Sequence, residues 1–324
     1  MTGLADPAAL RLVVDRVARV PARHRAFTTP HQRARQFYRI PGPVLDQLLD
    51  LGFPHQGGGT GLVFDRNDLR SASLILGLRS PQRTAFLAMA GALAAAESNL
   101  AGAYAMRIEG SCPEPGHPGD CGYALSPAVR RSPAVLRLVA ADPGRFALDL
   151  RVGPGGRLDL TLSAGQRRLV EEAARLQFHL IPKGLTGDLG FAAETGLADC
   201  TLAMRFLAAR GAELGVAVRG ATGLCLSRPF ANRHCWLELR QAGRWLPADP
   251  FFLNALAGWG LIDGAAWPPH RCPAGAYWRL EVGVDEPVVT HRAAGAGPDR
   301  PRDSERLGPA YFLVRPAVGR SGGH

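Results

Sequence analysis

The sequence almost entirely lacks lysine. Of its 38 basic residues only Lys183 is a lysine, and the other 37 are arginine. With 39 glycines and 26 prolines, this skew is typical of the codon usage of a GC-rich bacterial genome. The net charge is +10, but acidic residues interrupt the arginines, and no nucleic-acid motif accompanies them. We therefore expect no nucleic-acid partner; an acidic protein, such as a carrier protein, would use this charge equally well.

Long apolar stretches are also missing. The longest, TAFLAMAGALAAA (84–96), is shorter than the ~20 residues that a membrane-spanning helix needs. The amino-terminal sequence MTGLADPAALRLVVDRVARVP carries charged residues inside its apolar stretch, unlike a secretory signal. We expect a cytoplasmic protein without membrane contact, in which the six cysteines are reduced thiols.

The length of 324 residues and the hydrophobic content of 46% allow a substantial core in two domains or one elaborated domain. The pattern predicts an α+β protein. Helices are expected at 8–20, 42–52, 80–98 and 164–181, and a β-meander at 104–163. We divide the chain into an N-terminal helix-and-sheet region (1–163) of unknown role, a second region (164–291), and a mobile tail (292–324) with a possible last strand at 310–316.

A β-hairpin is predicted in RHCWLELRQAGRWLPADPFF (233–252). If Gln241 and Ala242 form its turn, His234 lies directly opposite Asp249, within reach of a hydrogen bond. A three-residue turn would shift this pairing by one. Such a pair is more often a satisfied polar contact than a catalytic one, so the hairpin alone does not decide the function.

Cys200 stands where a helix is expected to begin. Asp199 is a suitable N-cap, and the alanine-rich sequence that follows predicts a helix to Arg210, before Gly211. Cysteine pKa values at helix N-termini fall from about 8.5 to about 3.5–7.5, which would favour a reactive thiolate. The alternative is a small core residue, since cysteine is among the most buried residue types.

The order of Cys at a helix start, His on a strand and Asp on the next strand resembles the transglutaminase-like superfamily of papain-type cysteine enzymes. The matching segments lie within residues 190–265: Gly196 and Cys200 followed by TLAMRFLAARG, then LGVAVRGATG (214–223), HCWLEL (234–239) and GRWLPADPF (243–251). The chain departs from the family pattern at Cys235, where alanine is usual, and at Phe251, where threonine is usual. The resemblance implies that residues 164–291 form a papain-like catalytic core, with a helix carrying the cysteine packed on an antiparallel sheet carrying the histidine and aspartate.

The resemblance also implies the roles. Cys200 would be the nucleophile that forms a thioester, His234 the general base and acid, and Asp249 the group that orients the imidazole. An oxyanion hole is needed as well; the Cys200 N–H is one donor, and Gln177 is a guess for another, its alternative being an exposed helix residue.

The expected activity is cysteine-dependent acyl transfer: amide or peptide hydrolysis, transamidation, or amide formation in a small-molecule pathway. The substrate would be a peptide, an amide or an acyl thioester, which a carrier protein could hold, and no cofactor is expected. One alternative is an arylamine N-acetyltransferase-like enzyme, although the ADP sequence and the late position of the triad count against it. The other is a non-catalytic binding or scaffold protein on a degenerate papain-like core.

The remaining cysteines and histidines give weaker signals. CPEPGHPGDC (112–121) contains two cysteines and a histidine that could bind zinc. The spacing fits the usual zinc motifs poorly, so a disulfide between Cys112 and Cys121 or a plain loop is favoured, and no metal is expected. Cys225, Cys235 and Cys272 are expected to be buried, and His179 and His270 have no partner visible in the sequence.

Overall fold

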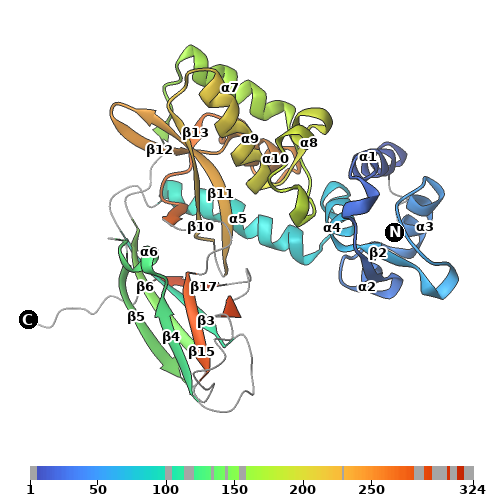
Figure 1. Ribbon diagram of the computed structural model, residues 1–324, viewed down its shortest axis with the longest axis horizontal. Coiled ribbons are helices and arrows are strands. Elements are labelled where there is room, and N and C mark those ends of the chain that lie inside the picture. The colour runs from blue at the N-terminus through green and yellow to red at the C-terminus, as the bar shows by residue number, and fades with distance from the viewer. Residues whose placement is uncertain are drawn as a thin grey trace, which may run out of the picture. The chain divides into compact units, whose positions relative to one another are not determined.

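The computed structural model describes residues 6–98, 104–112, 120–132, 135–142, 145–152, 158–227, 230–280, 288–293, 305–306 and 312–316. This part of the chain is a mixed α+β fold with several antiparallel sheets (Figure 1). Among the described residues, no helix is both long and apolar enough to cross a membrane. Most of the tail that was expected to be mobile lies outside the described residues.

The chain folds into two compact units, each assembled from separate segments. Unit 1 contains Met1–Leu87, Leu162–Ala217 and Pro250–His270, and unit 2 contains Ala88–Thr161, Val218–Asp249 and Arg271–His324. The chain therefore passes from one unit to the other several times. The division of the sequence at residues 163 and 291 stays a prediction.

Unit 1 is mainly helical. Its helices are α1 (Pro7–Ala18), α2 (His31–Gln36), α3 (Gly42–Asp50), α4 (Arg66–Ile75), the first part of α5 (Pro81–Ser98), α7 (Ala164–Arg175), α8 (Leu189–Thr195), α9 (Cys200–Glu213) and α10 (Pro250–Gly258). Two strand pairs complete the unit: β1 (Phe27–Pro30) is antiparallel to β2 (Val63–Asp65), and β8 (Gln177–Phe178) is parallel to β9 (Leu197–Ala198).

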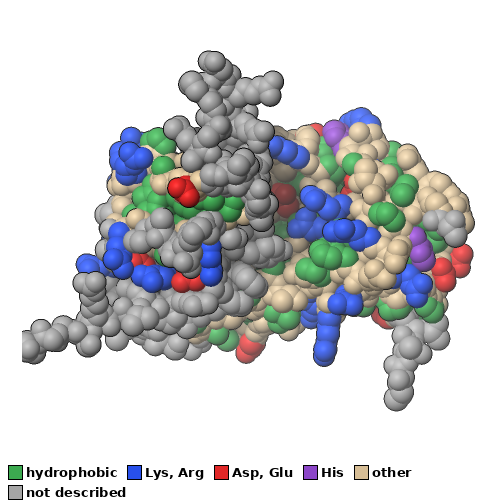
Figure 2. Space-filling model, turned by 90° about the horizontal axis from the view of Figure 1, so that it is seen from below, with side chains coloured by type: hydrophobic (Ala, Val, Ile, Leu, Met, Phe, Trp, Pro, Cys, Tyr) green, Lys and Arg blue, Asp and Glu red, His purple; other side chains and the backbone are tan. Residues whose placement is uncertain are grey.

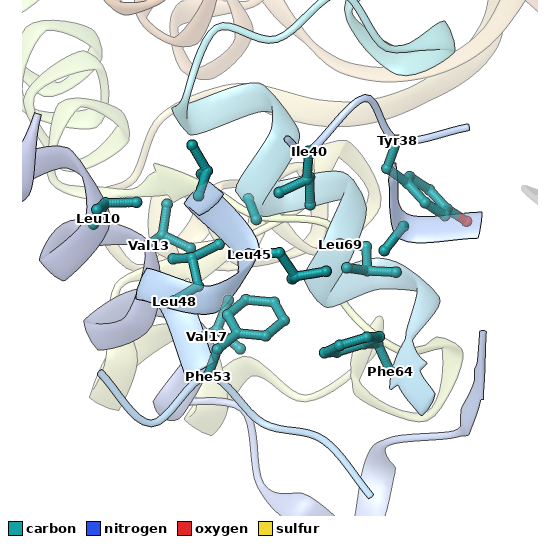
Figure 3. Close-up of a cluster of buried hydrophobic side chains, with 13 residues drawn as sticks. Leu10, Val13, Val17, Tyr38, Ile40, Leu45, Leu48, Phe53, Phe64 and Leu69 are labelled. Carbon is teal, nitrogen blue, oxygen red and sulfur yellow. The ribbon is translucent and has the colours of Figure 1, made fainter. Parts of the chain in front are cut away.

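The first core of unit 1 forms around α1, α3 and α4. Leu10, Val13 and Val17 are spaced to share one face of α1, and all three are buried. Figure 3 shows them beside the buried side chains of the other elements. The remaining members of this cluster are Ala34, Tyr38, Ile40, Val44, Leu45, Leu48, Phe53, Phe64, Leu69 and Ala72.

A second part of unit 1 surrounds α7, α9 and α10. The side chain of Ser163 caps α7 in a reciprocal capping box with Gln166. The helix predicted to run to residue 181 ends at Arg175, because Leu176 adopts an extended backbone and residues 177–178 enter β8. The ring of Phe178 then packs against aromatic side chains of α5, α10 and the residue that follows α10: Phe86, Phe251, Phe252 and Trp259.

Unit 2 is built on an antiparallel sheet with the strand order β14-β10-β11-β17-β3-β6-β5. These strands are β3 (Tyr104–Ser111), β5 (Val135–Asp142), β6 (Arg145–Val152), β10 (Val218–Cys225), β11 (Phe230–Gln241), β14 (Tyr277–Leu280) and β17 (Phe312–Pro316). β12 (Arg244–Ala248) pairs with the far end of β11. Figure 1 shows β17 beside β3, so the predicted last strand exists and lies inside the sheet rather than at its edge.

Smaller elements complete unit 2. β4 (Cys121–Leu125) pairs with β15 (Val289–Ala293), which also pairs with β16 (Glu305–Arg306), and β7 (Leu158–Asp159) pairs with β13 (Arg271–Cys272). The short helix α6 (Pro127–Arg130) follows β4. The prediction of a β-meander over 104–163 is therefore wrong, because β4 pairs with β15 near the end of the chain rather than with its neighbours in the sequence.

Candidate active site

Cys200 is the first residue of α9, as the sequence predicted. A carboxylate oxygen of Asp199 accepts a hydrogen bond from the Leu202 amide at 2.9 Å, so Asp199 is the N-cap. The Cys200 side chain is half-buried. The predicted end of the helix is wrong, because α9 continues through the buried Gly211 to Glu213.

Burial makes the negative charge of the Asp199 cap unfavourable. Burial raises the pKa of Asp199 to about 6, against the opposing effect of the Leu202 and Thr201 amides that donate to it. The backbone N–H groups at the helix start favour the ionised Asp199 carboxylate, but the effect of burial, which disfavours it, is larger.

Gln177 is not the exposed helix residue of the alternative interpretation. It opens β8 and pairs in parallel register with Leu197 of β9, the strand that leads directly into Asp199 and Cys200. Its amide donates to the Gly196 carbonyl at 2.7 Å. The side-chain oxygen of Gln177 is buried and accepts no hydrogen bond from the described residues. Gln177 is therefore held on the strand adjacent to the one that delivers Cys200.

His234 and Asp249 are brought together by the hairpin. Nε2 of His234 lies 2.5 Å from Oδ2 of Asp249, and both side chains are buried. A carboxylate only accepts hydrogen bonds, so the shared hydrogen belongs to Nε2, and Nδ1 is the other ring nitrogen. The predicted contact is present, but its predicted register is wrong.

The register differs because the turn lies one residue later than expected. Gln241 pairs with Arg244 and Leu237 with Ala248, so the turn residues are Ala242 and Gly243. Both have positive φ, 47° and 79°, as a type I′ turn requires. Each pairing is thereby displaced by two positions. A shift of two keeps every side chain on its face of the sheet, and Asp249, the residue that follows β12, is still within hydrogen-bond distance of His234.

Tyr277 is a site residue that the sequence did not reveal. Its hydroxyl donates to Oδ2 of Asp249 at 2.7 Å, and its ring meets the His234 ring edge-on at a centroid distance of 5.1 Å. The Trp236 ring stacks at 6.1 Å from that of His234. Tyr277 lies on β14, which pairs with β10 rather than with the hairpin, and no local signal in AYWRL marks it. The imidazole therefore contacts two aromatic rings and a carboxylate oxygen that also accepts the hydrogen bond of Tyr277.

Other residues of the segments VAVRG, HCWLE and GRW form a separate network in this sheet. Nε of Arg219 on β10 lies 2.6 Å from the buried Glu238 carboxylate on β11, and its guanidinium lies 4.4 Å from the centre of the Trp245 ring on β12. Arg279 on β14 lies 3.5 Å from the same carboxylate. With Arg279, these residues join the four strands β10, β11, β12 and β14, which gives them a structural role.

The candidate residues are distributed over both units: Cys200 and Gln177 belong to unit 1, and His234, Asp249 and Tyr277 to unit 2. The cysteines expected to be buried, Cys225, Cys235 and Cys272, are buried. Burial raises the pKa of the Cys225 and Cys272 thiols, the latter to about 11, so these two are poor nucleophiles at neutral pH. Comparisons of the chain with models of known families and with curated proteins gave no match.

Proposed function

We propose that the protein is a cysteine-dependent acyltransferase or amidohydrolase of the transglutaminase-like kind, with Cys200 as nucleophile, His234 as base and Asp249 as orienting group. The observation that carries the proposal is the His234–Asp249 bond. It uses Nε2, so proton exchange with a thiol would use Nδ1, and the imidazole tautomer is fixed by the carboxylate. The capped start of α9 is a second supporting observation, because it holds a half-buried thiol in the first turn of a helix.

The proposed reaction has two stages. The Cys200 thiolate attacks an acyl carbonyl and forms a C–S bond, which gives a tetrahedral oxyanion; the oxyanion then collapses to the thioester as the bond to the leaving group breaks and the imidazolium of His234 protonates that group. Water or an amine then attacks the thioester, losing its proton to His234 while the sulfur leaves as thiolate. The first case hydrolyses the substrate and the second forms a new amide.

The oxyanion of each tetrahedral intermediate needs hydrogen-bond donors, each worth about 2.7–4 kcal/mol in a comparable enzyme. The amide of Cys200 lies in the first turn of α9, at the positive end of the helix dipole. Gln177 is the second candidate, because β8 holds it beside the strand that enters α9. Its side-chain NH₂ group would be the donor.

A surface in unit 1 suits an acidic carrier of the acyl group. α2 and the residues after it line a hollow of about 670 Å³ that includes Arg35, Arg39 and His31. Arg33 and the exposed Phe37 line an adjoining hollow. On the face seen in Figure 2, Lys and Arg side chains occur in several separate groups, some of them beside Asp or Glu side chains. Attraction of a negatively charged carrier by such a surface would accelerate encounter.

The first experiment measures the iodoacetamide labelling rate of each cysteine against pH by peptide mapping. We expect Cys200 labelling to persist well below pH 7 in the wild type and to fall at least tenfold at pH 6.5 in His234→Ala. Cys272 is the internal control, because its raised pKa (about 11) predicts slow labelling in both proteins. Labelling of Cys200 that rises only near pH 8.5 and is unchanged in His234→Ala would favour the binding-protein alternative.

A second experiment looks for the thioester directly. Incubation with a panel of acyl thioesters and activated peptidyl esters should give a covalent adduct of the wild type, read by intact mass and mapped to Cys200. Cys200→Ala should give none, whereas Cys235→Ala should retain it. The absence of any adduct on Cys200 across the panel would contradict acyl transfer as proposed.

A further inference from the structure

Unit 2 contains a second cluster of chemically reactive side chains, formed by Cys112, Cys121 and His291. The two thiol sulfurs and a ring nitrogen of the histidine all lie within 4.8 Å of one another. All three residues belong to unit 2, and none of them takes part in the proposed acyl transfer. His117, the histidine of the CPEPGHPGDC segment, lies outside the described residues.

The strands explain how three distant segments meet. Cys112 directly follows β3, and Cys121 opens β4. β4 pairs with β15, and His291 is opposite Tyr123. Because side chains alternate along a strand, Cys121 lies on the same face as Tyr123 and therefore as His291. The sheet register thus places a thiol and an imidazole side by side, and the end of β3 adds the second thiol.

One distance in the cluster matches that of a tetrahedral zinc site, and the others lie within 4.8 Å. Sγ of Cys112 lies 3.6 Å from Nε2 of His291. With Zn–S of about 2.3 Å and Zn–N of about 2.0–2.1 Å, two ligands at tetrahedral corners are separated by about 3.6 Å. His291 is buried, and the two cysteines are half-buried, so the nitrogen is shielded while one side can admit an ion.

We propose that Cys112, Cys121 and His291 bind one zinc ion. Two thiolates neutralise its charge, and binding releases the two thiol protons. Two soft sulfur ligands with an imidazole select zinc over magnesium or calcium, which prefer oxygen. The ion would fix the end of β3 and the start of β4 to β15. It would thereby join Cys112 and His291, which are 179 positions apart in the sequence. The three residues supply three of the four ligands of a tetrahedral site, and the proposed role is to hold these segments together, in contrast to the thiol chemistry proposed for Cys200.

The test is the metal content of the full-length protein. Protein produced with added zinc and dialysed free of excess ion should carry about one zinc per chain by inductively coupled plasma mass spectrometry. Cys112→Ser and His291→Asn should reduce the content at least fivefold. Cys200→Ala is the matched control and should retain the wild-type zinc content. If the zinc were instead held by Cys200, His234 and Asp249, this variant would lose it.

A measurement on the wild type keeps the proposal testable if the variants do not fold. Cobalt added to zinc-free protein should give the thiolate-to-cobalt charge-transfer band and the intense visible bands of a tetrahedral site, and zinc should abolish both. The proposal is overturned if the wild type binds neither ion, or if it contains a Cys112–Cys121 disulfide, seen as a mass lower by two hydrogens. Equal zinc in His291→Asn and the wild type would overturn it too.

Discussion

Tyr277 donates its hydroxyl hydrogen to Oδ2 of Asp249, the same oxygen that lies 2.5 Å from Nε2 of His234. One carboxylate oxygen therefore holds both a phenol from β14 and an imidazole from β11. The tyrosine fixes the carboxylate, and the carboxylate fixes the ring. In the proposed mechanism Tyr277 is a positioning residue, since it acts through Asp249.

This relationship predicts a graded loss of thiol activation. Tyr277→Phe removes one hydrogen bond, worth about 1 kcal/mol, so we expect Cys200 labelling at pH 6.5 to slow by about fivefold. Asp249→Asn should slow it by more, because the amide can present its NH₂ group to Nε2 and favour the other tautomer. The measurement is the second-order rate constant with iodoacetamide, and Tyr38→Phe in unit 1 is the control. Equal rates in all four proteins would remove Tyr277 and Asp249 from the mechanism.

The N-cap of α9 predicts a stability difference. Asp199→Ala leaves the Leu202 amide without its partner and should lower the free energy of unfolding by about 1 kcal/mol. Asp199→Asn retains an oxygen acceptor and avoids ionising a group whose pKa burial raises to about 6, so its unfolding free energy at pH 8 should stay within about 0.5 kcal/mol of the wild type. Urea unfolding measures both; an asparagine variant as unstable as the alanine one would show that the charge matters rather than the cap.

The hairpin turn predicts a stabilising substitution. Ala242 has a φ of 47°, a conformation that costs an L-residue with a Cβ about 1 kcal/mol and that asparagine tolerates better. Ala242→Asn should therefore raise the unfolding free energy by about 0.5–1 kcal/mol. Ala193, exposed in α8, is the matched site where the same substitution should destabilise, because asparagine is a poorer helix former. If Ala242→Asn destabilised as Ala193→Asn does, the turn assignment would be wrong.

His179 predicts a specific pH dependence. It is fully buried, neither ring nitrogen has a hydrogen-bond partner among the described residues, and burial together with Arg16, Arg25 and Arg19 lowers its pKa to about 3. Between about pH 3 and 6.5 the unfolded chain binds a proton there that the folded chain does not. The stability due to neutral His179 is therefore complete above pH 6.5 and is lost as the pH falls, by about 1.4 kcal/mol per pH unit.

The matched variant is His179→Leu, which cannot titrate. We expect the unfolding free energy of the wild type minus that of the variant to fall by about 1 kcal/mol between pH 6 and pH 5 in urea titrations. Asp68 and Asp199, whose pKa values burial raises to about 7 and about 6, change stability in the opposite direction, but they contribute equally to both proteins. A difference that does not vary with pH would show that His179 is protonated or exposed in the folded state.

The elements of the candidate site were largely predictable from the sequence, because their signals are local. An aspartate before an apolar run fixes the start of α9 at Cys200, and alternating residues around a glycine turn indicate the hairpin. The register was not predictable: whether Gln241 or Gly243 belongs to the turn depends on Ala242 adopting a positive φ, which alanine does not favour. Contact between His234 and Asp249 survived this error because a shift of two preserves the face.

Gln177 illustrates a different limit. The helical periodicity of 164–175 continues into the following residues, so the predicted helix extended to residue 181. The chain instead turns into β8, because pairing with β9 and the burial of Phe178 among Phe86, Phe251 and Trp259 are tertiary interactions. Local propensity is a weak preference that such packing overrides.

The sequence by itself determined the start of α9 at Cys200, the cap at Asp199 and the face shared by His234 and Asp249. Each depends on residues that are neighbours in the chain or on the alternation within one strand. Only the tertiary structure decided that Tyr277 joins Asp249, that Arg219 joins Glu238 and Trp245, and that His291 meets Cys112. Those contacts require pairing between strands that the sequence separates by tens to hundreds of residues, and pairing partners are selected by the packing of the whole sheet, which no local pattern encodes.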